Sequence, residues 1–224
     1  MRSPATPRRR IWPWIVVGVV AIIVAIAITN TLRQEGVTTP TAEPSATTSP
    51  STPVGDAAPT GCLGGEARDA AMVLAAQAEA PKSTNGAIEV ATAFVRWLNQ
   101  YPYPEATDIE LIEAEAIASN APTQDIAGFY AASPNLSGGL VPDGGNYYLS
   151  TLGGVYQLES ADPDAVTASI GTVLVIDGAL SPTLKGSITV EVVWEDDRWK
   201  FVSSEGTRTT EDLFAVGLAF SGGC

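Results

Sequence analysis

An unbroken apolar run near the N-terminus constrains this chain more than any other feature. Residues 11–29 read IWPWIVVGVVAIIVAIAIT and contain no charged side chain. About 20 apolar residues are enough to cross the hydrocarbon core of a bilayer as a helix. Four arginines precede the run, and basic residues flanking a span favour the cytoplasmic side. We therefore expect a single-pass protein of the cell membrane, with a basic cytoplasmic tail at residues 1–10, a transmembrane helix at 11–29 and an extracytoplasmic remainder.

A cleaved signal peptide is the alternative to an anchor. Residues 25–27, Ala-Ile-Ala, resemble the small-residue site at which signal peptides are cut. The apolar run is long for a signal peptide, and no polar stretch separates it from the candidate site. An uncleaved anchor is the favoured interpretation, and cleavage stays open.

A stalk is expected to follow the membrane segment. Residues 30–61 are dominated by Thr, Pro, Ser and Ala, and they contain few large apolar side chains. Such a segment cannot bury enough apolar surface to offset the entropy of ordering it. Its prolines favour extended conformations, so we expect a semi-rigid spacer. The compact domain is then predicted to cover residues 62–224.

The charge of the chain is unevenly distributed. All 25 acidic residues follow the apolar run, whereas four of the 12 basic residues precede it. The part beyond the membrane is therefore strongly acidic. A surface of this sign repels phosphate backbones, which argues against nucleic-acid binding by the outer domain.

The two cysteines lie at the two ends of the predicted domain. Cys62 opens it and Cys224 is the last residue. An even number of cysteines in an oxidising compartment favours one disulfide. Such a bridge would be worth roughly 4–5 kcal/mol in the chain-entropy model. Two unrelated free thiols are the alternative.

Helical patterns fill the first half of the domain. Residues 66–80 are rich in alanine and are followed by a proline. Residues 85–100 carry a wide apolar stripe after the candidate N-cap Asn85. Residues 107–119 place apolar side chains on one helical face and acidic side chains on the other. Residues 134–154 are expected to be irregular because they contain two turn-forming clusters, Asn-Leu-Ser-Gly-Gly at 135–139 and Asp-Gly-Gly-Asn at 143–146.

Strand patterns fill the second half. Alternating or β-branched runs occupy residues 154–160, 165–177, 187–195 and 198–203. Asp196 and Asp197 separate the last two runs, which predicts a tight hairpin with a tryptophan on each arm. Thr209 with Asp212 is a weak capping box, and the apolar tail after it is expected to form a short helix or an edge segment.

Helices followed by an antiparallel meander predict an α+β fold. The order of elements resembles that of NTF2-like or cystatin-like domains. The resemblance implies a curved sheet wrapped around a few N-terminal helices, with a cone-shaped cavity between them.

Residues with catalytic or metal-binding patterns are absent from the sequence. The chain has no histidine, which excludes Ser-His-Asp and Cys-His systems and imidazole metal sites. No phosphate-binding or nucleophile-elbow motif occurs. The pairs Glu110 with Glu113 and Asp162 with Asp164 are interpreted as solvated surface rather than as acid–base or Ca²⁺ sites. We expect no catalytic residue, no cofactor and no metal.

Four tyrosines beside Pro or Gly are candidates for partner contact. Exposed tyrosines are enriched at protein interfaces because they combine a large ring with a polar tip. Packing of the loops against the domain is the alternative for these side chains. The four are Tyr101, Tyr103, Tyr147 and Tyr148.

Residues 61–77 (GCLGGEARDAAMVLAAQ) and 85–104 (NGAIEVATAFVRWLNQYPYP) carry a further resemblance. They look like a family of actinobacterial membrane-anchored proteins associated with conjugation and integrative elements. Its layout, an anchor followed by an NTF2-like outer domain, is similar to that of the bitopic assembly-factor subunit of type IV secretion systems. The resemblance implies a non-enzymatic scaffold that contacts other envelope subunits and itself. No functional residue is transferred by it.

Three functional hypotheses follow. The favoured one is a scaffold or assembly subunit of a conjugation or secretion channel, acting through protein–protein contacts. The second is an extracytoplasmic module that holds a small apolar ligand or lipid in the cavity. The third is a cryptic enzyme, which would need a buried carboxylate in that cavity.

Overall fold

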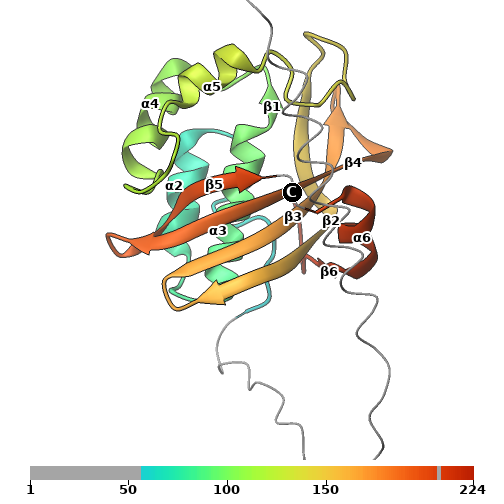
Figure 1. The fold of residues 1–224 in the computed structure, drawn as a ribbon. Helices are drawn as coiled ribbons and strands as arrows, with labels where there is room; N and C mark the ends of the chain where they lie inside the picture. Colours follow the sequence, from blue (N-terminus) through green and yellow to red (C-terminus); the bar gives the residue numbers. More distant parts are fainter. Residues whose placement is uncertain (1–56, 206–207) are drawn as a thin grey trace, which may run out of the picture. The chain divides into compact units, whose positions relative to one another are not determined.

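The computed structural model describes residues 57–205 and 208–224. They form an α+β domain in which helices precede a curved antiparallel half-barrel sheet, as the sequence predicts (Figure 1). Within this part of the chain no helix combines the length and apolar character needed to cross a bilayer. The predicted basic tail, the transmembrane run and most of the stalk lie outside the described residues. The helices are α2 (Ala70–Glu79), α3 (Thr84–Leu98), α4 (Ala106–Glu115), α5 (Ile126–Ala132) and α6 (Thr210–Val216).

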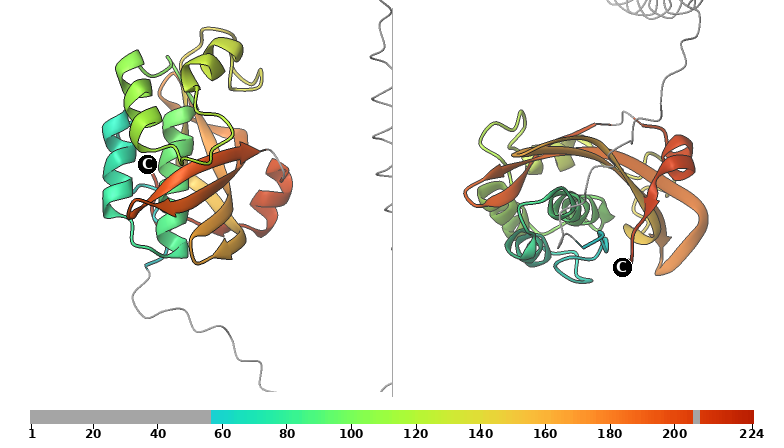
Figure 2. Two further views of the ribbon diagram at one scale, coloured as in Figure 1. Left: turned by 60° about the vertical axis from the view of Figure 1, so that its left-hand side comes forward. Right: turned by 90° about the horizontal axis from the view of Figure 1, so that it is seen from below.

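The sheet is a meander in which each strand pairs with its neighbour in the chain. All pairs are antiparallel, in the order β1-β2-β3-β4-β5, and β6 pairs with β2. Helices α2 and α3 lie on the concave side, and α6 lies on the convex side (Figure 2). The strands are β1 (Gln100–Tyr101), β2 (Tyr147–Asp162), β3 (Ala165–Ile176), β4 (Ala179–Glu195), β5 (Arg198–Glu205) and β6 (Leu218–Ala219).

Helix α3 forms the centre of the domain. Thirteen of its fifteen residues are buried, so it is enclosed on nearly every side. Ile88, Ala91 and Val95 pack against the sheet. Trp97 packs among the other helices, and Phe94 lies between them and Phe201 of β5. A helix that is apolar around most of its circumference is stable only when fully covered. The concave face of the sheet provides much of that cover.

Two N-caps differ from the sequence prediction or were missed by it. The Oγ of Ser83, not Asn85, accepts a hydrogen bond from the backbone N–H of Gly86, and α3 begins at Thr84. Asn85 instead donates to the carbonyl of Ala57. Helix α5, which the sequence did not reveal, is capped by Asp125 through the N–H of Gly128 at 2.6 Å. Short polar side chains compete for caps within a few residues, so pattern alone does not select one.

The domain begins before Cys62. Thr60 and Gly61 donate backbone hydrogen bonds to the carboxylate of Glu89, which is only 7% exposed on α3. The N–H of Ser221 donates to the carbonyl of Pro59 at 2.9 Å. Residues 57–61, assigned to the stalk from composition, are therefore part of the domain. A buried carboxylate requires such donors, and composition does not identify which segment supplies them.

The hairpin of β4 and β5 follows the prediction closely. Trp194 pairs with Trp199, and their ring centroids lie 5.3 Å apart. Asp196 and Asp197 have φ angles of 52° and 59°, the left-handed conformation that a two-residue type I′ turn requires.

Strands β2 and β4 are longer than the sequence indicated. β2 begins at Tyr147 and includes Gly153-Gly154, and β4 begins at Ala179 and includes Pro182. On β2 the two glycines lie where the register with β3 is interrupted, between Ser150 and Val155. On β4 the proline lies at the interruption opposite Val173–Val175 of β3. Bulges accommodate residues that otherwise break a strand, so the region 134–154 is irregular only up to residue 146.

The two ends of the domain meet at the cysteine pair. The sulfur atoms of Cys62 and Cys224 lie 2.03 Å apart, at disulfide distance, and the two residues have a sequence separation of 162. Thr151 on β2 forms hydrogen bonds with Cys224. The Thr151 N–H donates to the Cys224 carbonyl, and the Thr151 Oγ1 accepts from the Cys224 N–H. Thr209 caps α6 as predicted, and the tail then continues into β6.

Removing the disulfide should lower stability without changing the fold. We expect the double variant Cys62→Ser, Cys224→Ser to lose up to roughly 4–5 kcal/mol of unfolding free energy, because the unfolded chain gains the freedom of a very long loop. Urea unfolding followed by circular dichroism measures this loss. A reducing agent should destabilise the wild type and leave the double variant unaffected. An unchanged wild-type midpoint after reduction would contradict the bridge.

Candidate functional site

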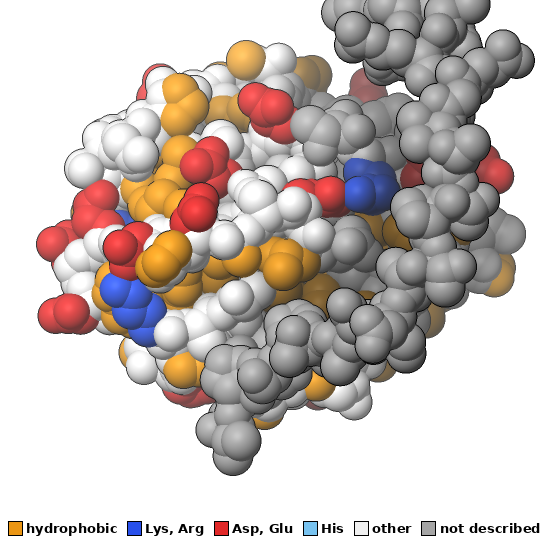
Figure 3. Space-filling model, turned by 60° about the horizontal axis from the view of Figure 1, so that its bottom comes forward, with side chains coloured by type: hydrophobic (Ala, Val, Ile, Leu, Met, Phe, Trp, Pro, Cys, Tyr) orange, Lys and Arg blue, Asp and Glu red, His pale blue; other side chains and the backbone are white. Residues whose placement is uncertain are grey.

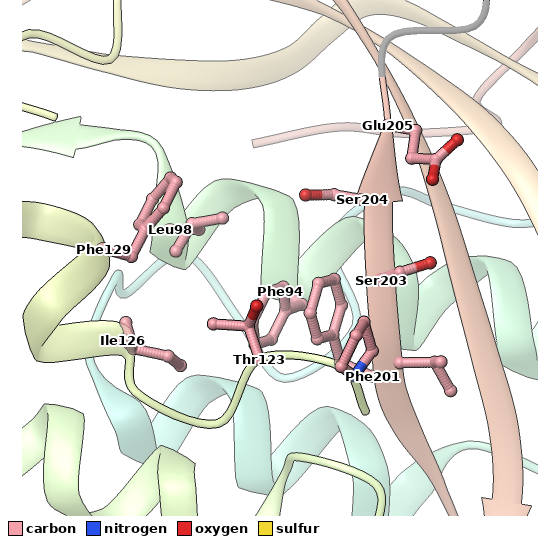
Figure 4. A pocket seen from close by; sticks show the side chains of 11 residues that line it. Phe94, Leu98, Thr123, Ile126, Phe129, Phe201, Ser203, Ser204 and Glu205 are labelled. Carbon is pink, nitrogen blue, oxygen red and sulfur yellow. The ribbon is translucent and has the colours of Figure 1, made fainter. Parts of the chain in front are cut away.

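An apolar groove lies beside the outer edge of β5 (Figure 4). It has a volume of about 240 Å³ and opens to solvent. We call it the edge groove. Its lining comes from α3, from α5 with the loop before it, and from β5: Phe94, Leu98, Pro122, Thr123, Ile126, Phe129 and residues 201–205.

Aromatic packing builds the floor of the edge groove. The rings of Phe94 on α3 and Phe201 on β5 stack with centroids 3.9 Å apart and planes 14° from parallel. Phe94 is almost fully buried, whereas Phe129 on α5 remains 37% exposed. The floor is therefore fixed by the core, and the wall formed by α5 offers an uncovered ring.

A register shift shapes the β5 side of the groove. The pairing of β4 with β5 runs regularly from Glu195↔Arg198 to Val192↔Phe201 and then resumes at Glu191↔Ser203. One extra residue, Val202, lies on β5 at this point. Bulges bend a strand and re-aim the side chains that follow. The side chain of Ser204 points into the groove, and those of Ser203 and Glu205 point away from it (Figure 4).

The outer edge of β5 is paired along only part of its length. Phe201 donates its N–H to the Ala116 carbonyl at 2.9 Å and accepts from the Ala118 N–H at 2.8 Å, in a parallel bridge. In the described residues no strand covers the edge beyond this point, along residues 203–205. Unpaired strand edges are ready templates for a further strand.

A second hollow extends the groove toward β4. It shares Leu98, Phe129 and Ser204 with the edge groove and adds Ser187 and Ile188. The Oγ of Ser187 is buried and has no hydrogen-bond partner among the described residues. The lining of this extension is mixed, because Asn99, Ser204 and Glu205 also contribute to it.

Carboxylates gather on the other side of the same strand end. Glu159, Glu191 and Glu205 line a hollow of about 240 Å³, together with Thr167, Thr189 and Ser203. Arg208 forms hydrogen-bonded ion pairs with Glu159 at 2.6 and 2.7 Å, and these bonds lower the pKa of that carboxylate. Acidic side chains are spread over the face drawn in Figure 3, where Lys and Arg occupy only small areas. The end of β5 therefore separates an apolar hollow from an acidic one.

The cone-shaped cavity implied by the NTF2-like resemblance is filled in the described domain. Side chains of α3 occupy the concave face, where Ile170 and Trp199 are at most 1% exposed. The edge groove is what stays open at the rim of that face. Its volume lies below the roughly 300–1,000 Å³ typical of small-molecule sites.

One member of each candidate carboxylate pair, Glu113 and Asp164, makes a structural contact. Glu113 accepts hydrogen bonds from the N–H groups of Ile126 and Ala127 and so caps α5. Asp164 forms an ion pair with Lys82 at 2.5 Å. In the described part of the chain no group of three or more acidic, Cys or His side chains is arranged to hold a metal ion.

The structure separates the four predicted tyrosines. Tyr147 is 4% exposed and belongs to the core, so its ring packs within the domain. Tyr103 stacks on Tyr130 with centroids 4.5 Å apart and donates to the Ser133 carbonyl, so it packs the loop. Tyr148 lies beneath the guanidinium of Arg68, and Tyr101 contacts Tyr103 edge-on. Three of these rings remain partly exposed, but none lines the edge groove.

The groove residues were missed because they come from separate elements. Phe129 and Ile126 lie on α5, whose only sequence signal is Asp125 with Gly128 ahead of a short apolar stretch. The sequence pattern predicts that Phe201 belongs to the core. One face of its ring does pack on Phe94 there, and the residue also lines the groove.

No protein-family model matches the chain, and comparisons with curated proteins and with solved structures give no significant match.

Alkaline pH should destabilise the domain through its buried tyrosines. Burial raises the pKa of Tyr147 to about 12, above the value of about 10 for an unfolded tyrosine. The raised pKa means that the folded state favours the neutral phenol. The contribution of this group to the unfolding free energy is therefore complete below pH 10 and is lost as the pH rises through 12.

The variant Tyr147→Phe should reduce that loss. Its hydroxyl is buried without a partner in the described residues, so the change should alter stability by no more than about 1 kcal/mol at pH 7. Unfolding free energies between pH 8 and 12 should then fall less steeply than in the wild type. Equal slopes in the two proteins would contradict the assignment.

Proposed function

We propose that this protein is a non-enzymatic, membrane-anchored scaffold or assembly subunit that acts through protein–protein contacts at the edge groove. The observation that carries the proposal is an apolar hollow lying directly beside a strand edge, residues 203–205, that no strand of the described residues covers. Apolar side chains and free backbone groups together are what a protein segment can satisfy. Small metabolites rarely satisfy both.

The charge and size of the site support the same class of function. The open groove of about 240 Å³ is too shallow to enclose a substrate. The acidic domain disfavours nucleic acid as the partner. An apolar ligand in a cone-shaped cavity, the alternative, would need space that the side chains of α3 occupy.

The cellular setting belongs to the same proposal. We propose that residues 11–29 anchor the chain in the cell membrane, that the stalk holds an NTF2-like or cystatin-like domain outside it, and that the partners are envelope subunits of a conjugative or type IV secretion-like apparatus. The apolar run supports the anchor, and the curved sheet around helices supports the fold family. The likeness of residues 61–104 to conjugation-associated proteins supports the apparatus. Self-association through the same domain is part of that expectation.

Site-specific photo-crosslinking in native membranes tests this proposal. A photoreactive phenylalanine at position 129 should form adducts with other envelope subunits that have extracytoplasmic parts, such as channel components. The same group at Leu111, which is 41% exposed on α4, is the matched control and should give few adducts. Recovery of the protein without any partner from position 129 would refute the scaffold function.

A further inference from the structure

We infer that the edge groove binds an extended, basic segment of a partner protein, which adds to β5 as a new strand. This inference rests on the proposed function and specifies the partner's chemistry. It predicts a segment in which apolar and basic side chains alternate.

The backbone argument comes from the edge of β5 itself. Residues 116–118 already form an isolated parallel bridge with this edge at Phe201, so the outward backbone groups of that residue bond to a segment that is not one of the sheet strands. The edge then continues through residues 202–205, about 13 Å at roughly 3.3 Å per residue. A guest of four or five extended residues would continue the line that residues 116–118 begin.

The side-chain argument comes from the two faces at this strand end. Alternate side chains of an added strand point to opposite faces of the sheet. One set would meet the apolar groove with Phe94, Leu98 and Phe129. The other set would meet the hollow that contains Glu191 and Glu205. Apolar residues therefore fit the first face, and Lys or Arg fit the second.

Charge disfavours a second copy of the chain as the guest. Two β5 edges in contact would bring Glu205 and Glu191 of both copies together, and the excess of acidic residues adds long-range repulsion. Residues 116–118 also occupy part of the edge that a symmetric pairing would need.

The chain's own stalk is a poor guest for a different reason. Residues 31–56 contain prolines at 40, 44, 50 and 53, which cannot donate to a strand ladder. Their charged residues are mostly acidic. A basic segment from another protein satisfies the backbone, the groove and the carboxylates together.

Peptide binding to the full chain in phosphatidylcholine nanodiscs tests the inference. The probe is a fluorescein-labelled peptide of three Val-Lys repeats, and the readout is fluorescence anisotropy. A Val-Glu peptide is the charge control, and a Val-Lys peptide with alternate N-methylated amides is the backbone control. We expect the Val-Lys peptide to bind at least tenfold more tightly than either control, with affinity falling as salt rises.

Matched variants locate the binding surface. Phe129→Ala should weaken the Val-Lys peptide at least tenfold, whereas Leu111→Ala, on an exposed face of α4, should not. The double variant Glu191→Gln, Glu205→Gln should weaken it and flatten the salt dependence, whereas Glu110→Gln should not. Melting temperatures close to that of the wild type establish that each variant is folded.

Four results would overturn the inference. Equal binding of the N-methylated peptide would show attraction to an acidic surface without strand addition. Crosslinks from position 129 into residues 31–56 would make the stalk the occupant, and crosslinks into a second copy would make it a dimer interface. Failure of all peptides while position 129 still crosslinks to envelope subunits would reject strand addition and leave the scaffold function standing.

Discussion

The burial of α3 against the concave sheet is the constraint on which the rest of the domain depends. The helix is apolar around most of its circumference, and the sheet curves so that β2 to β5 all reach it. Arg96, fully buried on the same helix, donates hydrogen bonds to the carbonyls of Gly65 and Ala67 and so orders the segment after Cys62. Glu89, about two turns earlier on the same face of the helix, accepts hydrogen bonds from the N–H groups of Thr60 and Gly61. One helix thus organises both the sheet and the entry of the chain.

Because side chains fill the concave face, the edge groove lies at its rim. In the described domain α6 lies on the convex face, and α2 and α3 lie beneath the sheet (Figure 2). The end of β5 is left with an apolar hollow on one side and an acidic one on the other. The bulge at Val202 and the uncovered ring of Phe129 are local features that suit a docking edge better than a core.

Much of the fold could be predicted because its signals are local. The tryptophan hairpin follows from Asp196-Asp197 between two alternating runs, and the cap at Thr209 follows from a residue three positions later. Strand ends were harder to predict, because Pro182 and Gly153 break a pattern but are accommodated by bulges. The start of the domain at residues 57–61 depends on Glu89, about 30 positions away, and no local pattern records such a contact.

The edge groove could not be predicted for the same reason. It joins α3, α5 and β5, and its open backbone edge is a property of strand order rather than of any residue. The tyrosines were chosen from their neighbours Pro and Gly, yet Tyr147 alternates inward on β2 and is buried. Turn residues identify where a chain bends, whereas the direction of a side chain near the bend depends on register.

The claim that the outer edge of β5 docks a partner is tested most directly by hydrogen exchange on the full-length protein. Exchange in native membranes is compared with exchange of the purified protein in nanodiscs. The account predicts that amides of residues 202–205 and of α5 exchange more slowly in native membranes, where partners are present, and that α3 exchanges equally slowly in both. Equal exchange at residues 202–205 in both samples, or protection confined to another surface, would contradict a docking edge at β5.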